Sequence, residues 1–152
     1  MSNLRAFNEK FEFNGVIYPK ITLQMIFDLA WKEFIVNEAN PCVDKLGLCA
    51  YDNRKGGRCA IGLAIPPDHP ALYNRSSFAG LVKKFPGIWG IDVLNLDPKV
   101  QDRFQLALHD IYVPRDSENP CKVKWSAPLA TRKMAYENVA RALGLTIPPS
   151  GE

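Results

Sequence analysis

The segment between Thr22 and Asn40 constrains the fold more than any other part of the chain. Apolar side chains recur through it every three or four residues, which is the spacing of one face of an α-helix. They are Leu23, Ile26, Phe27, Ala30, Trp31, Phe34 and Ile35. A stripe this broad needs other elements packed against it, so the sequence predicts a core helix. Thr22 is the predicted N-cap, and Asn40 before Pro41 marks the predicted end, because a residue before proline avoids helical geometry.

Turn and cap signals elsewhere in the chain complete the prediction of an α+β fold. Asn14 and Gly15 stand between apolar runs at residues 11–19, and this dipeptide predicts a hairpin with a type I′ turn. Further helices are predicted at residues 76–85, 97–111 and 126–143. We expect a small antiparallel sheet of β-hairpins packed against about four helices, in a single globular domain over residues 1–152.

A second hairpin is predicted around the basic turn at residues 52–57. The runs "LCAY" (48–51) and "RCAIGLAI" (58–65) flank this turn and have the composition of short strands. Cys59, Ile61, Leu63 and Ile65 alternate with residues that are mostly small, so a period of two would place these four on one face. A buried helix of the same length is the alternative, and the proline pair at 66–67 ends the segment in either case.

Charge and hydropathy exclude several classes of protein. The chain has 152 residues and a formal net charge of +3, which is too small to require nucleic acid or an anionic membrane and argues against an acidic DNA mimic. No apolar run approaches the ~18 residues of a membrane span, and residues 1–13 have no signal-peptide core. We therefore expect a cytoplasmic protein whose thiols stay reduced.

Several short motifs resemble one known group of proteins. They are "GRCAIGLAIP" after "LCAY", then "LALHD", and a final helix ending in "LGLTIP". In this order they resemble a family of small proteins encoded by phages and bacterial prophage regions, over residues 22–147. The order Leu63–Ala64 departs from the family pattern, which has a small residue followed by leucine. The resemblance implies an accessory gene of a mobile element, and it carries over no catalytic residue.

Cys59 and His109 are the candidate catalytic residues. A thiol hydrolase or transferase needs a cysteine beside a histidine, with an acid that orients the imidazole. Asp110 follows His109 directly, but neighbouring residues of a helix point about 100° apart, so Asp110 is badly placed for that role. Free cysteine is also among the most buried residue types, and core packing is the favoured interpretation of Cys59.

The cysteines allow two further interpretations. They are Cys42, Cys49, Cys59 and Cys121. Cys49 and Cys59 would face each other across the predicted hairpin within reach of a disulfide, although a reducing cytosol favours two packed thiols. A zinc site would combine Cys42, Cys49 and Cys59 with His69 or Cys121, but the chain has no C-x-x-C pair. We predict no metal and no cofactor.

The basic turn is the candidate binding site for a small anionic ligand. Arg54, Lys55 and Arg58 surround two glycines, and cations beside exposed backbone amides can hold a phosphate. The segment lacks the lysine–serine/threonine pair of a P-loop. A solvated hairpin tip and a charged edge that docks a protein are the alternatives.

Trp89 and Trp125 are candidate anchors for a protein partner. They lie in segments without helical spacing, and aromatic side chains dominate interface hot spots. The alternative is that both rings cover the edge of the core. Other basic residues are dispersed and balanced by acids, which argues against nucleic acid as a partner. They are Lys83, Lys84, Lys122, Lys124, Arg132 and Lys133.

These features together favour a non-enzymatic accessory protein of the phage or prophage type that binds a host protein or a small ligand. Such binding would serve, for example, to inhibit a host defence. The alternatives are a small thiol hydrolase or transferase and a nucleic-acid-binding regulator. The oligomeric state and the identity of the partner have no signature in the sequence.

Overall fold

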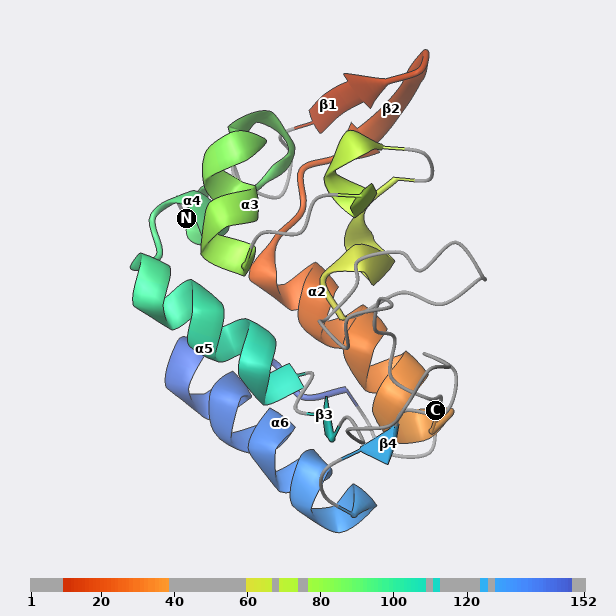
Figure 1. The fold of residues 1–152 in the computed structure, drawn as a ribbon, viewed down its shortest axis with the longest axis vertical. Coiled ribbons are helices and arrows are strands. Elements are labelled where there is room, and N and C mark those ends of the chain that lie inside the picture. The colour runs from red at the N-terminus through yellow and green to blue at the C-terminus, as the bar shows by residue number, and fades with distance from the viewer. Residues whose placement is uncertain are drawn as a thin grey trace.

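A computed structural model of the chain describes residues 10–38, 60–66, 69–73, 77–108, 111–112, 124–125 and 128–148. Its architecture is α+β, as predicted, with antiparallel strand pairs beside a body of packed helices (Figure 1). The strands are β1 (Lys10–Phe13), β2 (Val16–Pro19), β3 (Ile111–Tyr112) and β4 (Lys124–Trp125). The α-helices are α2 (Leu23–Ala30), α3 (Phe78–Lys84), α4 (Ile91–Leu94), α5 (Pro98–Leu108) and α6 (Leu129–Leu143). A π-helix, η1 (Trp31–Val36), and the 3-10 helices η2 (Gly62–Ala64), η3 (Pro70–Tyr73) and η4 (Pro86–Ile88) connect them.

The core helix begins where the sequence predicts. Thr22 Oγ1 accepts a hydrogen bond from the backbone amide three residues later at 3.2 Å, which caps α2. All seven side chains of the predicted stripe are buried. At Trp31 the helix widens into η1, and the helical run ends at Val36 rather than at Asn40. Glu38 already has a left-handed φ of 52°, which a right-handed helix does not contain.

The predicted hairpin at residues 11–19 is confirmed. β1 and β2 pair antiparallel, with Phe13 opposite Val16 beside the turn. Asn14 and Gly15 have φ angles of 52° and 77°, and two successive left-handed residues are the signature of a type I′ turn. Figure 1 shows this hairpin at one end of the helical body.

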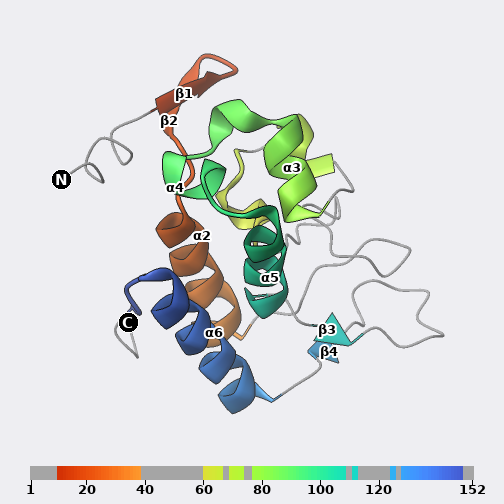
Figure 2. The same ribbon diagram turned by 90° about the vertical axis from the view of Figure 1, so that its left-hand side faces the viewer.

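Helices α3, α5 and α6 pack one against the next beside α2 and η1 (Figure 1). α5 packs against α3 and α6, and α6 also contacts η1, as the views from two sides show (Figures 1 and 2). Phe104 of α5 and Tyr136 and Ala140 of α6 are buried in one apolar cluster with α2. Gly144 closes α6 at a left-handed φ of 70°, as its position after the last apolar residue predicts. Among the described residues, no helix combines the length and the apolar character that a membrane crossing requires.

Residues 60–66 do not form the predicted strand. Ile61 begins a tight turn that continues into η2, with the Ala64 and Ile65 amides donating to carbonyls three residues earlier at 3.2 Å. Ile61 and Ile65 are buried, at 0% and 2% exposure, whereas Leu63 between them is only half-buried. A spacing of four places side chains on the same side of a helical turn, so the helical alternative fits this segment better than the strand. The first half of the predicted second hairpin lies outside the described residues.

β3 and β4 form a second, separate antiparallel pair. Ile111 lies opposite Trp125, and Tyr112 lies opposite Lys124. The sequence predicts Ile111 as the end of the helix from Pro98, but α5 ends at Leu108 and Ile111 is in a strand. Trp125, predicted in a loop, is likewise in a strand. Pairing between segments distant along the chain is absent from a local pattern, which explains both corrections.

Candidate functional site

Most residues that the sequence singles out lie outside the described residues. They are Arg54, Lys55, Arg58, Cys59 and His109, together with Cys42, Cys49 and Cys121. The basic turn and the Cys59–His109 pair therefore stay predictions. Within the described ranges, no group of three or more His, Cys, Asp or Glu side chains is placed to hold a metal ion.

Trp89 is a core residue, so of its two interpretations the structure favours the one in which the ring packs at the core over the one in which it anchors a partner. Its exposure is 0%, and its ring meets Phe78 edge-on with 5.4 Å between the ring centroids. Around it the backbone is tied to the start of α2, because the Gly90 amide donates to the Ile21 carbonyl at 2.7 Å. A ring without exposed surface cannot anchor a partner. The side chain of the other candidate, Trp125, is outside the described part of the structure.

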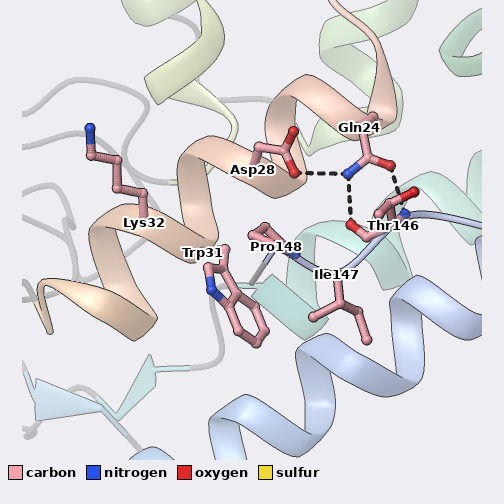
Figure 3. A pocket seen from close by; sticks show the side chains of 7 residues that line it. All are labelled: Gln24, Asp28, Trp31, Lys32, Thr146, Ile147 and Pro148. Carbon is pink, nitrogen blue, oxygen red and sulfur yellow. Dashed lines mark hydrogen bonds between the residues drawn. The ribbon is translucent and has the colours of Figure 1, made fainter. Parts of the chain in front are cut away.

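An open groove lies between α2 and the chain that follows α6, with a volume of about 410 Å³. We call it the α2 groove. It is lined by Gln24, Asp28, Trp31, Lys32, Thr146, Ile147 and Pro148 (Figure 3). Trp31 is buried beneath it, whereas Asp28, Lys32, Thr146 and Ile147 are exposed. The groove is therefore shallow and open to solvent.

Gln24 shapes the α2 groove by tying α2 to the C-terminal segment. Its Nε2 donates to the Thr146 carbonyl at 2.8 Å, and its Oε1 accepts from the Thr146 amide at 2.8 Å. The same Nε2 donates to Asp28 Oδ1 at 2.8 Å (Figure 3). One side-chain amide thus satisfies both backbone groups of Thr146, as a neighbouring β-strand would. This double hydrogen bond sets the distance of the segment from α2.

Trp31 forms the apolar floor of the groove. It is 2% exposed and packs against Phe27 and Tyr136, with ring centroids 6.0 and 6.2 Å away. Lys133 Nζ lies 5.9 Å from the indole centroid, within the range of a cation–π contact. In Figure 3 the indole nitrogen lies on the side of the ring away from Ile147, so the ring turns hydrocarbon toward that residue. Nε1 has no hydrogen-bond partner in the part of the chain that the structure describes.

Sequence reasoning places Trp31 in the core but misses the groove. Gln24, Asp28 and Lys32 recur every four residues, and the hydrophobic pattern assigns them only to the polar face of the core helix. From Ile147 onward the sequence predicts a tail. The bond between Gln24 and Thr146 spans 122 positions, and no local signal announces such a contact.

Arg132 and Lys133 contact the core helix, so they are not part of an open basic surface. Arg132 Nη1 donates to the Phe34 carbonyl at 3.0 Å, which joins α6 to η1. Partial burial lowers the pKa of Arg132, while Tyr136 and Glu38 act in the opposite direction, and the guanidinium stays charged at neutral pH. Lys133 lies over the Trp31 ring. Both residues therefore have a role in packing.

Comparison with known proteins finds no matching family model, no match among curated proteins and no match among solved structures.

Proposed function

We propose that this protein is a non-enzymatic accessory protein of the phage or prophage type, and that it acts by holding a segment of a host protein in the α2 groove. The observation that carries this proposal is an exposed apolar side chain, Ile147, in a groove whose rim bears the opposite charges of Asp28 and Lys32. The phage context comes from the motifs at residues 22–147. Interference with a host defence is the outcome expected of such a protein.

The shape of the groove favours a protein segment over a small molecule. Its volume of about 410 Å³ lies within the ~300–1,000 Å³ of small-molecule pockets, but such pockets bury ~70–90% of their ligand. Four of the seven lining residues are exposed here, namely Asp28, Lys32, Thr146 and Ile147. A small ligand would keep much of its surface in water, whereas a protein segment makes further contacts beyond both ends of the groove.

The two kinds of lining residue contribute differently to affinity. Ile147, at 37% exposure, has apolar surface to bury against the partner, and burial contributes ~25 cal/mol per Å². Asp28 and Lys32 are exposed, and an exposed ion pair contributes only ~0–1 kcal/mol. We therefore expect the apolar contact to supply most of the affinity and the rim charges to orient the segment.

The test combines identification of the partner with matched variants. A partner captured from bacterial lysate is purified, and its Kd is measured by titration calorimetry. Ile147→Asp should weaken binding at least about tenfold, which corresponds to ~1.4 kcal/mol. Lys32→Glu should weaken it less, with a dependence on salt. Leu106→Asp is the matched control, because Leu106 is 64% exposed on α5 and does not line the groove.

Each alternative function predicts a result that would count against the groove proposal. If Ile147→Asp keeps full affinity while combined alanine substitutions of Arg54, Lys55 and Arg58 abolish it, the basic turn is the binding site and the groove proposal is wrong. Alkylation of Cys59 faster than that of a free thiol near neutral pH would favour the thiol enzyme. A gel shift with nucleic acid that weakens steeply with salt would favour the regulator.

A further inference from the structure

His69 is a buried titratable side chain beside the β1–β2 hairpin. Its exposure is 7%, and its Nδ1 accepts a hydrogen bond from the Ala71 amide at 3.0 Å. A nitrogen that accepts a hydrogen bond carries no proton, so the neutral ring holds its proton on Nε2. The folded structure therefore requires the uncharged form of His69.

Two phenyl rings from different elements flank the imidazole. Phe13 of β1 lies with its ring centroid 4.7 Å away at an interplanar angle of 48°. Phe85, which follows α3, lies 5.6 Å away with its edge toward the imidazole, at 71°. Phe85 packs against the core, and Ala71 of η3 belongs to it. His69 thus joins the hairpin to the helical body.

Protonation conflicts with this arrangement. A second proton would enter at Nδ1 and point at the Ala71 amide, so that two donors would face each other at 3.0 Å. The resulting cation would also be enclosed by the hydrocarbon of Phe13 and Phe85. Contact of a cation with phenyl rings offsets part of this loss, but burial still lowers the pKa of His69 from its usual value of 6.5.

Among the residues that the structure describes, the charged side chains on the surrounding elements do not relieve the conflict. On β1, Lys10 and Glu12 are exposed and alternate with the phenylalanines, so they lie on the opposite face. At the end of α3, Lys83 and Lys84 are exposed and cationic, and η3 contains no charged residue. Asp68, the chain neighbour, lies outside the described residues. Desolvation is accordingly the cause of the lowered pKa of His69.

We infer that His69 is a pH-operated clamp, which in its neutral form holds the β1–β2 hairpin against η3 and the end of α3 and releases the hairpin when protonated. Release would uncover Phe13 and Phe85 beside Val16 and Ile17, which are already 49% and 61% exposed. The clamp is a property of the hairpin and does not depend on the α2 groove.

The direction with pH follows from proton binding. The released state has the ordinary pKa of 6.5 and the closed state a lower one, so the released state binds more protons between the two values. The closed state is therefore fully favoured above pH 6.5 and loses stability as the pH falls through 6.5 toward the lower pKa. One proton changes the ratio of closed to released protein by up to about tenfold per pH unit in that window.

Hydrogen exchange of the whole chain, read by mass spectrometry and corrected for intrinsic rates, measures this release. Between about pH 5 and pH 7.5, protection of residues 10–19 should fall by up to about tenfold per pH unit below 6.5. The amides of α6 (Leu129–Leu143) should keep their protection, which distinguishes local release from global unfolding. A parallel loss of protection in α6 would overturn the clamp.

Two substitutions of His69 test its role. His69→Phe keeps a ring between the phenylalanines, and His69→Asn keeps an acceptor near the position of Nδ1. Neither side chain titrates, so the hairpin should show a flat pH profile in both. His109→Gln removes the other histidine and should retain the wild-type profile. A wild-type profile in either His69 variant overturns the inference. If neither variant folds, NMR titration of the wild-type protein decides, and a His69 pKa at or above 6.5 refutes the clamp.

Discussion

Replacement of Trp89 tests how the core is built. The indole is fully buried and meets Phe78 edge-on at 5.4 Å, and its Nε1 has no hydrogen-bond partner in the described part of the chain. Trp89→Ala removes the whole ring and leaves a cavity that the packed helices cannot fill. We expect it to lower the free energy of unfolding by about 3–5 kcal/mol.

Trp89→Phe separates two effects of opposite sign. The smaller ring leaves a residual cavity of ~40 Å³, which costs about 1 kcal/mol at ~24 cal/mol per Å³, and the lost burial of the removed ring atoms costs about 1 kcal/mol more. It also removes a buried N–H group, whose missing partner costs about 1–3 kcal/mol in the native protein. Because the two effects are of similar size, the expected net change in unfolding free energy is within about 1 kcal/mol.

Urea denaturation followed by circular dichroism measures both variants without relying on the substituted fluorophore. For a slope near 2 kcal/mol per molar, the midpoint should fall by about 2 M for Trp89→Ala and should shift by less than about 0.5 M in either direction for Trp89→Phe. Trp31→Phe is a matched control, because Trp31 is buried and its Nε1 is also unpartnered among the described residues. Equal losses in Trp89→Phe and Trp89→Ala would refute the reasoning, since the indole N–H would then be stabilising the fold.

Other substitutions test single contacts by the same denaturation assay. Thr22→Ala should lower the free energy of unfolding by about 1 kcal/mol because it removes the cap of α2, whereas Thr22→Ser retains the capping hydroxyl. Equal urea midpoints for the two variants would contradict the role of the cap. Gly90→Ala places a methyl carbon 3.2 Å from Thr22 Cγ2 and should cost about 1–3 kcal/mol. Gly87→Ala meets open space and should be neutral or stabilising. If Gly87→Ala and Gly90→Ala lowered the midpoint equally, the contact between position 90 and Thr22 would not explain the loss. Tyr136→Phe removes the 2.6 Å hydrogen bond to the Leu108 carbonyl and should cost about 1–2 kcal/mol, and an unchanged midpoint would contradict that bond.

The elements that the sequence predicts well are those whose cause is local. The turn at Asn14 and Gly15 needs two residues that tolerate a left-handed φ, and the sequence supplies them together. The core helix needs a cap and a stripe, and both lie within one short window from Thr22. Gly144 closes α6 for the same reason. In each case the stabilising groups are neighbours along the chain.

The strand prediction for a short apolar run was wrong because such a run fits both a strand and a helical turn. Ile61, Leu63 and Ile65 satisfy the period of two of a strand, but Ile61 and Ile65 also satisfy the spacing of four of a helical turn. The choice depends on which neighbours cover them, and these neighbours come from α2, which contacts η2. The sequence does not decide between the two interpretations of Trp89 for a related reason, since its burial comes from Phe78 and the start of α2 rather than from its own segment.

The α2 groove is the extreme case of such non-local determination. In the sequence, Gln24 is only a polar residue on the polar face of a helix. In the fold, its side chain hydrogen-bonds the backbone amide and carbonyl of Thr146. The two hydrogen bonds hold Ile147 and Pro148 beside Trp31, so the groove forms only because the segment after α6 packs against α2. A polar residue of α2 thus sets the width of an apolar site. A search for binding sites in chains of this kind should therefore weigh long-range side-chain to backbone pairs as heavily as exposed aromatic residues.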